Sequence, residues 1–592
     1  MNSSHSPRIS RRPIPDPGQW PAQMLPLLCR LYAARGATDA HLAQPRLAQL
    51  HPPEQLQGID AAVELLATAI SQRKRILVVG DFDCDGATAT ALAVRGLRLL
   101  GATDVVHAVP NRIEHGYGLS VGLVAELAAL QPDLLVTVDH GIACLPGVTA
   151  AKALGWQVLV TDHHLPGPQL PPADAIVNPN RGDDGFPSKA LAGVGVMFYV
   201  LLALRAHLRR QGVFAPGAEP DLGVLLDLVA VGTVADLVPL DANNRALVAA
   251  GLRRLRAGQG SVGLQALIRA SGRHAAKLSA SDIGFALGPR INAAGRLEDM
   301  SLGIELLLTD DPARAADIAQ LLEEINSERR AVQQQMTDEA QAAVARVQGL
   351  SLDSRPLAAC LYDPEWHPGV IGLVASKMKD QLYRPVIAFA PAEPGSTMLR
   401  GSARSIPGFH IRDALAAVNA LAPGLMDKFG GHAMAAGLSL PAEHLAAFTA
   451  AFQAEAGRCL QPHQLQAELL SDGELADHEL DASHARALRA AGPWGQGFEE
   501  PLFDGVFSVV QWRVLKERHL RLVLRTAGGR ELNAIHFGGW QGVAPSARVH
   551  LAYRLAEDDY RGGDAVQLIV EYCAAIEDAG VAAGVRMEAT PA

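Results

Sequence analysis

The sequence predicts an α/β protein: a parallel, helix-covered sheet joined by a long helix to a smaller α/β domain, with a small β-barrel at the C-terminal end. Three observations lead to this fold class. Short apolar runs alternate with helical patterns from residue 75 onward, which is typical of a parallel sheet. One helical pattern extends from 311 to 349. From residue 503 onward, strand patterns are separated by Gly-rich turns.

Length, composition and charge narrow the possible protein classes. The chain has 592 residues, which typically corresponds to about four domains. Hydrophobic residues make up 49% and charged residues 19%, so large buried cores are expected and general disorder is not. The formal net charge of −10 counts against a protein that coats nucleic acid or acidic membranes. Taken alone, this sign argues against DNA as a partner.

Cysteines and apolar segments indicate the compartment. The 6 cysteines are scattered without a CxxC pair, so neither a disulfide framework nor a zinc ribbon is expected. No apolar run follows the basic residues of the N-terminus, and two aspartates interrupt the most apolar stretch, 221–240. We therefore expect a cytoplasmic protein with no membrane association.

The first half of the chain divides into three predicted parts. Residues 1–70 form a polar lead followed by short helices, of which 61–70 is the clearest. Residues 71–310 form the sheet domain, and the long helix occupies 311–350. Asp311 can cap this helix, Pro312 suits its first turn and Gly349 is placed to end it. A helix this long predicts a bridge between two lobes, and the alternative is a surface helix within one domain. Strands of the sheet are expected at 76–79, from 105, at 134–138 and at 158–160.

The second half of the chain divides into two further predicted domains. A smaller α/β domain is expected over 351–460, with a strand at 385–389. The last part, 461–592, contains five predicted strands and Gly-rich turns, which favours a barrel of the OB type. These strands are expected at 506–514, 519–525, 531–537, 548–555 and 566–572.

Three carboxylates at alternate positions follow the first apolar strand. They are Asp81, Asp83 and Asp85, and anions this close repel one another unless a cation binds them. An EF-hand calcium loop shares this opening, but it needs a bidentate acid where the chain has Leu92, and it would follow a helix. If the strand alternation persists, Cys84 should point away from the three acids.

Two further strands end in the same way. Strand 134–138 runs into an Asp-His pair at 139–140, and strand 158–160 runs into an Asp-His-His triplet at 162–164. A fourth acid, Asp236, lies in an apolar stretch where an uncompensated carboxylate would be unfavourable to bury. Functional groups gather at the carboxyl ends of parallel strands, so these clusters can converge. Each acid alone is as easily a helix cap, but together the acids and histidines predict a metal site. Carboxylates mixed with imidazole, without a set of cysteine thiolates, favour manganese or magnesium over structural zinc.

With these motifs the sequence resembles the DHH phosphoesterases, a family named for the triplet at 162–164. The resemblance extends from about residue 50 to 575 and is greatest to bacterial single-strand-specific DNA exonucleases of that family. The matching stretches are GDFDCDG (80–86), PNRIEHGYG (110–118), VTVDHG (136–141), TDHH (161–164), GTVADLVPL (232–240), GPRINAAGR (288–296), HPGVIG (367–372), GSARSIPG (401–408) and GGH (430–432).

The resemblance implies a metal centre with two Mn²⁺ or Mg²⁺ ions. Asp139 is the expected bridge between the ions, and His164 is expected to face the scissile phosphate. The metal ligands implied are Asp81, Asp83, Asp85, Asp139, His163 and Asp236.

The resemblance also implies substrate contacts. The segment 351–460 is similar to the DHH-associated domain, in which Ser402, Arg404 and His432 match nucleic-acid-binding motifs. In the sheet domain, 71–310, three arginines match positions in family stretches that contact phosphate: Arg112, Arg290 and Arg296. Which of the last two touches the scissile phosphate stays open.

The predicted barrel carries a local positive charge that the net charge conceals. Between 506 and 525 five basic residues accompany one acid and one tryptophan, and OB folds hold single strands with such aromatics and cations. The alternative is a solvated strand face with a core tryptophan. The candidate strand-binding residues are Trp512, Arg513, Arg518 and Arg521.

The function implied is a single-strand-specific 5′→3′ exodeoxyribonuclease that releases 5′-mononucleotides in DNA repair and recombination. Two ions roughly 3.5–4 Å apart can lower the pKa of a water and hold the attacking and leaving oxygens, so no covalent nucleophile is needed. The implied partners are single-stranded DNA, a helicase and a single-strand-binding protein, and we expect a monomer.

Three alternatives are weighed. Smaller DHH relatives hydrolyse short oligoribonucleotides or dinucleotides, whereas the barrel and long helix favour a longer strand. A non-catalytic scaffold would have decayed metal ligands, and each ligand position is intact here. A dinucleotide-binding dehydrogenase lacks the G-x-G-x-x-G fingerprint after the first strand.

Overall fold

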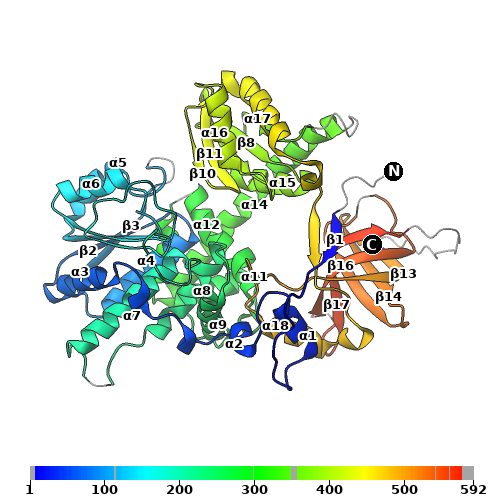
Figure 1. Ribbon diagram of the computed structural model, residues 1–592, viewed down its shortest axis with the longest axis horizontal. Helices are drawn as coiled ribbons and strands as arrows, with labels where there is room; N and C mark the ends of the chain where they lie inside the picture. The colour runs from blue at the N-terminus through cyan, green and yellow to red at the C-terminus, as the bar shows by residue number, and fades with distance from the viewer. Residues whose placement is uncertain are drawn as a thin grey trace. The chain divides into compact units, whose positions relative to one another are not determined.

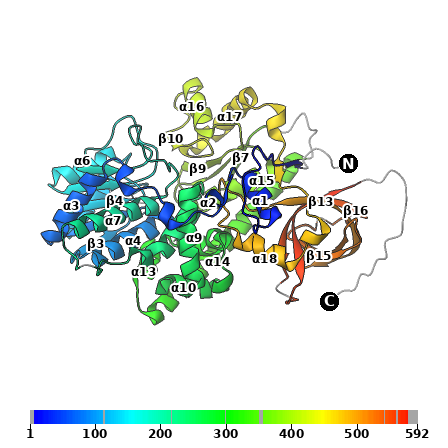
Figure 2. The ribbon, with the colours of Figure 1, turned by 60° about the horizontal axis from the view of Figure 1, so that its bottom comes forward.

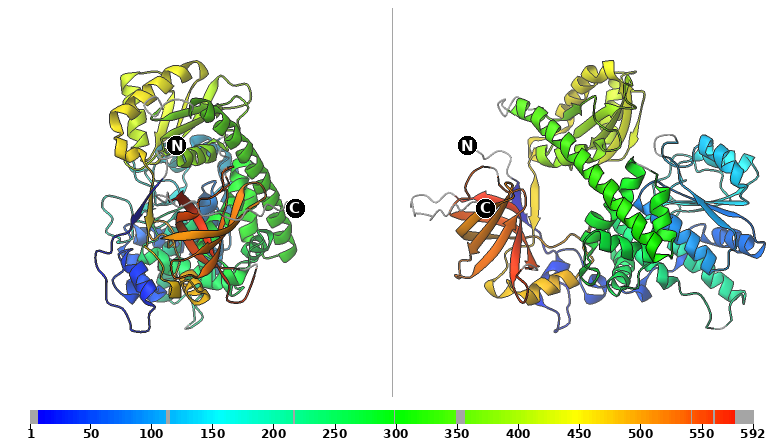
Figure 3. Two further views of the ribbon diagram at one scale, coloured as in Figure 1. Left: turned by 90° about the vertical axis from the view of Figure 1, so that its right-hand side faces the viewer. Right: turned by 180° about the vertical axis from the view of Figure 1, so that it is seen from behind.

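The computed structural model describes residues 7–111, 115–215, 217–297, 299–348, 356–540, 542–558 and 561–576. The chain forms two compact units, one made of residues 1–10 and 324–469 and the other of residues 11–323 and 470–592. The boundary falls within α14 (Pro312–Gln348), a single long helix that is visible in Figure 3. As predicted, the Asp311 carboxylate caps its first turn by accepting from the Ala313 N–H.

The larger unit contains the predicted parallel sheet, with strand order β3-β2-β4-β5-β6. All four strand pairs are parallel. The strands are β2 (Ile76–Gly80), β3 (Val105–Ala108), β4 (Leu134–Val138), β5 (Gln157–Thr161) and β6 (Ala175–Val177). The first four confirm the sequence prediction, while the three-residue β6 was not predicted because it is too short to show a pattern.

Helices cover both faces of this sheet, which is why β2 and β4 are buried at every position. Figure 1 shows α5 (Val121–Leu127) and α6 (Leu145–Ala153) on one face. On the other face lie α3 (Ile59–Ser71), α4 (Cys84–Leu99) and α7 (Gly193–Arg210).

A helical layer continues from α7 and packs against α4. The apolar stretch around Asp236 forms α8 (Leu226–Ala235), which is followed by α9 (Ala242–Arg256) and α10 (Val262–Ala270). A short α11 (Ala280–Asp282) leads into one π-helical turn, η6 (Ile283–Leu287), and then into α12 (Gly288–Leu297) and α13 (Ser301–Leu308). The layer therefore places Asp236 and the 288–296 motif beside α4.

The smaller unit contains a five-stranded mixed sheet of order β10-β11-β9-β8-β7. Its strands are β7 (Ala359–Tyr362), β8 (Val386–Pro391), β9 (Met398–Arg404), β10 (Lys428–Gly431) and β11 (Ala435–Pro441). Helices α16 (Ile411–Leu421) and α17 (Leu445–Cys459) cover one face, where Phe389, Phe448 and Phe452 are buried. Helix α15 (Ile371–Leu382) packs against β8 and β9.

The C-terminal strands close into a barrel of order β13-β14-β15-β17-β16, the connectivity of an OB fold. Only β15 and β17 pair in parallel. The strands are β13 (Phe503–Leu515), β14 (His519–Arg525), β15 (Glu531–His536), β16 (Arg548–Glu557) and β17 (Val566–Ala575), and all five were predicted. Figure 2 shows α18 (Ala482–Ala490) beside the barrel.

An aromatic stack ties the barrel to the rest of the larger unit. Trp494 and Phe498 stack with ring centroids 5.3 Å apart, and Tyr32 from the N-terminal segment stacks on both. The guanidinium of Arg245 from α9 lies 3.8 Å from the centroid of the Phe498 ring. The junction after β12 (Glu468–Ser471) is therefore built from three separate parts of the chain.

Candidate functional site

The six predicted metal ligands and His164 come together at the carboxyl edge of the parallel sheet. Their donor atoms form overlapping groups in which all atoms lie within 4.8 Å of one another. Asp139, which was predicted to bridge two ions, belongs to two of these groups. The groups are Asp81, Asp83 and Asp139; Asp85, His163 and Asp236; and Asp139, His163 and His164.

The donor set fits divalent cations. The Nε2 atom of His163 lies 3.1 Å from Asp139 Oδ1 and 3.4 Å from Asp236 Oδ2. None of these three buried atoms has a hydrogen-bond partner within the described ranges. Burial, together with the His164 charge, lowers the pKa of His163 to about 4, so at neutral pH the ring offers a lone pair. Acceptors that converge without a donor are what a cation site requires.

The charges of the cluster lead to the same conclusion. Burial raises the pKa of Asp85 to about 7, with Asp83 as the next cause. Burial and the charge of Asp85 likewise raise the pKa values of Asp139 and Asp236 well above the ordinary range. Bound cations would remove this repulsion and restore the ionised carboxylates.

The first motif does not continue the strand alternation, because α4 begins at Cys84. Asp83 is the N-cap of that helix and accepts from the Gly86 N–H at 3.0 Å. The helix-cap alternative is therefore correct for Asp83, which nevertheless belongs to a donor group. Cys84 is buried in the first turn, and burial raises the pKa of its thiol.

Two glycines allow the acids to lie this close to the neighbouring helices. Asp85 accepts from the N–H groups of Gly193 (2.6 Å) and Val194 (3.1 Å) at the start of α7. A Cβ added at Gly193 would lie 2.5 Å from Asp139 Cβ, and one at Gly232 would lie 2.6 Å from Asp85 Oδ1. Neither glycine was predicted from the sequence, because nothing local marks a close approach to residues far away in the chain.

His164 is held by Asp162 and Tyr117. Its Nδ1 lies 2.8 Å from Asp162 Oδ1, and the Tyr117 hydroxyl lies 3.3 Å from either ring nitrogen. Burial alone would lower the pKa of His164, but the hydrogen bond and charge of Asp162 raise it. The ring is thus readily protonated. Sequence reasoning did not single out Tyr117, although the GYG stretch at 116–118 was an available signal.

Helix α12 supports the metal loop from the side. The Cys84 N–H donates to Asn292 Oδ1 at 2.7 Å, and a Cβ at Gly295 would lie 2.3 Å from the Phe82 carbonyl oxygen. Arg290 is only 6% exposed, forms an ion pair with Glu323 and donates to the Ala286 carbonyl.

Arg296 lies at the other end of the same helix and is only half-buried. Arg112, the third predicted phosphate-binding residue of this domain, lies outside the described residues.

The smaller unit holds a second polar cluster. Arg404 donates to the hydroxyls of Ser376 and Ser402, both at 3.1 Å, and among the described residues it forms no ion pair with a carboxylate. A Cβ at Gly372 would lie 3.0 Å from Arg404 Nη2, so the glycine leaves room beside the guanidinium. His432 lies in the β10–β11 hairpin, where its N–H donates to the Ala435 carbonyl.

The barrel presents two of its predicted arginines directly opposite each other. Arg513 and Arg521 are cross-strand partners in the β13–β14 pair, and like charges in such positions repel. Trp512 is half-buried, lies opposite the buried Leu522 and stacks on Trp540, with ring centroids 5.7 Å apart. Arg518 is exposed near the β13–β14 turn, whereas Arg525 pairs with Glu531.

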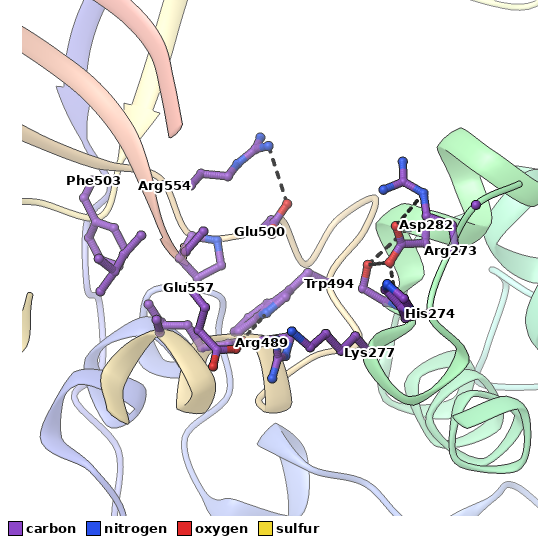
Figure 4. Close-up of a pocket in the computed structure, with 17 residues that line it drawn as sticks. Arg273, His274, Lys277, Asp282, Arg489, Trp494, Glu500, Phe503, Arg554 and Glu557 are labelled. Atoms are coloured by element: carbon purple, nitrogen blue, oxygen red, sulfur yellow. Dashed lines mark hydrogen bonds and ion pairs between the residues drawn. The ribbon is translucent and has the colours of Figure 1, made fainter. Parts of the chain in front are cut away.

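A cavity of about 330 Å³ lies in the larger unit between the region around α11 and the barrel (Figure 4). Its floor includes Trp494, and none of the metal-donor residues lines it. The acids that line it are each paired with a cation: Asp282 with Arg273, Glu500 with Arg554, and Glu557 with Arg489. Each acid of the cavity wall is therefore offset by an arginine, and Lys277 adds a further cation to the lining.

Comparison with known protein families gives three matches along the chain. The DHH family N-terminal domain matches residues 75–233, the DHHA1 domain matches residues 342–458, and the RecJ OB domain matches residues 471–572. The single-stranded-DNA-specific exonuclease RecJ of Escherichia coli K12 is 48% identical over 570 residues, covering 95% of this chain and 98% of its own. The chain belongs to the RecJ family.

Solved RecJ structures agree with this assignment. The crystal structure of Thermus thermophilus RecJ with Mn²⁺ has a TM-score of 0.77 at 33% identity, covering 93% of this chain and 76% of that one. The same protein with Mg²⁺ has a TM-score of 0.72 at 31% identity, covering 93% and 75%. The predicted fold, the assignment to metal-dependent nucleases and the choice of manganese or magnesium are thereby confirmed.

Within the described ranges, no helix has the length and apolarity needed to cross a membrane.

Without bound cations, the chain should lose stability as the pH rises from about 4 to about 7. The folded-state pKa of Asp85 is about 7 against an ordinary value of 3.8, so the folded chain binds more protons in this window and stability falls with pH. Mn²⁺ competes with these protons and should raise the melting temperature more at about pH 8 than at about pH 5.5. Differential scanning fluorimetry in EDTA or Mn²⁺ measures both effects.

The matched variant is Asp85→Asn, which removes one charge from the cluster. It should flatten the pH dependence in EDTA and weaken the response to Mn²⁺. A wild-type response to Mn²⁺ that is larger at the lower pH would contradict the assignment of the site.

Proposed function

We propose that the chain is a single-strand-specific DNA exonuclease that works from the 5′ end and releases 5′-mononucleotides, using two Mn²⁺ or Mg²⁺ ions. The observation that carries the proposal is the shared position of Asp139, whose carboxylate belongs to two separate donor groups. A carboxylate in that position suits a pair of ions, and paired ions suit in-line displacement at phosphorus. The similarity to RecJ proteins supports the substrate class.

The protein side chains have distinct parts in this reaction. When bound, the ions would activate a water for attack and offset charge on the leaving oxygen. His164, kept readily protonated by Asp162, is placed to neutralise charge that develops on the phosphate. Asn292 and Gly295 hold the loop that carries Asp81 and Asp83 in register with α12. Arg296, the more exposed arginine of α12, is the better candidate for a phosphate contact.

The Arg404 cluster is proposed as the seat of the terminal 5′-phosphate. Among the described residues the Arg404 guanidinium donates to two hydroxyls and a carbonyl and to no carboxylate, so it keeps its full charge for an anion. Burial slightly lowers the pKa of Arg404, which stays a cation at any physiological pH. Ser402 and His432 are the other residues proposed to contact the strand in this unit.

The barrel is proposed to hold the strand farther from its 5′ end. The opposed pair Arg513 and Arg521 and the exposed Arg518 supply charge for the backbone, and the Trp512–Trp540 stack supplies an aromatic surface for bases. This second binding region favours a long strand over the short oligoribonucleotides or dinucleotides of smaller DHH relatives. A scaffold without activity is disfavoured because all six ligand positions converge.

Several wider roles follow from the family resemblance and stay part of the proposal. They are action in DNA repair and recombination, contacts with a helicase and a single-strand-binding protein, a monomeric state and a cytoplasmic location. The 6 cysteines are all free, which supports a reducing compartment. The family matches begin at residues 75, 342 and 471, which supports the proposed domain boundaries near 70, 350 and 460. The boundary at 310 stays part of the proposal.

Asp139→Ala should abolish cleavage while leaving the chain folded. Loss of the shared carboxylate should lower the cleavage rate more than about 100-fold. Substituting a residue that only supports a metal ligand typically lowers activity about 10- to 100-fold. The assay is digestion of 5′- and 3′-labelled single and double strands with and without Mn²⁺. Asp60→Ala, at an exposed position in α3, is the matched control. Near wild-type activity in a folded Asp139→Ala protein would refute the proposal.

Arg404→Ala should remove the preference for a 5′-phosphorylated strand. A charge-assisted contact supports roughly a 10- to 100-fold higher kcat/KM for the 5′-phosphate than for the 5′-hydroxyl in the wild type. In the variant the two strands should be cleaved at similar rates. Arg412→Ala, exposed on α16, serves as control. An undiminished phosphate preference in Arg404→Ala would place the 5′ end elsewhere.

A further inference from the structure

Three large exposed apolar side chains lie on segments that adjoin the metal centre. Leu165 directly follows His164, Leu237 directly follows Asp236, and Phe285 belongs to η6, which packs against α8. Their exposed fractions are 64%, 69% and 82%. Single exposed apolar residues are ordinary, but several around one polar site indicate a binding surface. We call these three residues the apolar rim.

Leu237 is the member that the fold explains least. Its backbone has φ = +60°, a left-handed conformation that bulky L side chains rarely adopt and that glycine or asparagine adopts readily. The side chain gains little burial in return. Neither backbone preference nor packing therefore accounts for a leucine here, and strain of this kind gathers at functional sites.

Phe285 lies on a rare π-helical turn that packs against α8, the helix that ends at Asp236. Ile283, Ala286 and Leu287 are buried, so the turn is anchored while Phe285 faces outward. A Cβ at Gly284 would lie 3.7 Å from Val234, and one at Gly288 would lie 3.2 Å from Ala235. The glycines on either side of Phe285 thus face the two residues that precede Asp236. Isolated π-turns are frequent at functional sites.

The metal-donor cluster and the apolar rim together indicate the kind of ligand that would bind. The carboxylate and imidazole cluster, once it holds cations, binds phosphate, whereas the rim offers apolar contact from two leucines and the flat ring of Phe285. A nucleotide carries both parts, and its base stacks on such side chains when the base is unpaired. In a duplex the faces of each base are already covered by neighbouring base pairs. The rim therefore suits a nucleotide from an unpaired strand.

We propose that Leu165, Leu237 and Phe285 receive the bases next to the scissile phosphodiester, so that an unpaired strand is recognised at the metal centre itself as well as on the barrel. The proposal rests on the proposed nuclease function and adds to it residues that determine specificity. The rim positions the substrate and takes no part in bond making or breaking. A protein partner docked on the rim is the competing occupant.

The test is a cycle between protein variants and base-free substrates. The probes are a 5′-phosphorylated single strand and the same strand with abasic sites at its first nucleotides. Phe285→Ala should lower kcat/KM on the normal strand roughly 10-fold, which corresponds to one stacked base. Leu237→Asn should lower it by less, because an aliphatic side chain contacts a base without stacking. On the abasic strand they should match the wild type, since the contact is already absent.

Further measurements separate this role from a structural one. Leu237→Asn should keep or raise the melting temperature, and both variants should keep the wild-type response to Mn²⁺. Leu154→Ala, at another exposed leucine of the larger unit, should act as wild type on both strands. Equal losses on the two strands, or no loss on either, would overturn the proposal, and the latter would favour a protein partner.

The rim and the nuclease proposal can fail separately. If the wild type cleaves neither strand, the proposed function fails, and the same cycle measured as binding affinity in Mn²⁺ still decides whether the rim holds bases. If the wild type cleaves the abasic strand as fast as the normal strand, the proposed nuclease function stands and the proposed role of the apolar rim is refuted.

Discussion

Repulsion between buried carboxylates is the constraint on which the rest of this site depends. Asp85, Asp139 and Asp236 are brought so close together that burial and mutual charge raise all their pKa values, and the neutral ring of His163 completes the donor set without supplying a proton. Such a cluster is stable as a set of anions only with cations bound. The surrounding structure holds the acids in place against this repulsion.

That support comes from elements far apart in the sequence. The first N–H groups of α7 bind Asp85, where the helix dipole also favours a negative charge. Glycines at 193 and 232 permit the approach of α7 and α8, and Asn292 fixes the first turn of α4. The parallel sheet contributes the common edge at which three strands deliver their acids and histidines. The net charge of −10 includes the five aspartates of this cluster, and it therefore does not argue against a nucleic-acid partner.

The sequence predicts those features of the fold and the site that depend on a local pattern of residues. The strands of both the sheet and the barrel follow from apolar runs and alternation, and the acids at strand ends stand out because anions seldom cluster after apolar residues. The convergence of Asp139 and His163 follows from the sheet topology, whereas Asp236 is placed by the packing of α8 against α4. The three-residue β6 falls below the length at which a pattern can be read, and in the sheet of the smaller unit only β8 was predicted.

What the sequence conceals depends on packing between distant segments. The bond from the Cys84 N–H to Asn292 spans more than 200 residues, and the approach of Gly193 to Asp139 leaves no local trace. Arg290 matches a phosphate-binding motif as well as Arg296 does, yet its pairing with Glu323 appears only when α12 meets α14. Likewise, Leu237 looks like one more apolar residue of its segment until its backbone angle and exposure are seen.

The central claim is that this cluster holds a pair of ions that share Asp139. The most direct measurement is electron paramagnetic resonance of the protein titrated with Mn²⁺. The account predicts two bound ions per chain whose spectrum shows magnetic coupling at saturation, and loss of that coupling in Asp139→Ala. A single bound ion, or two ions whose signals stay uncoupled in the wild type, would contradict it.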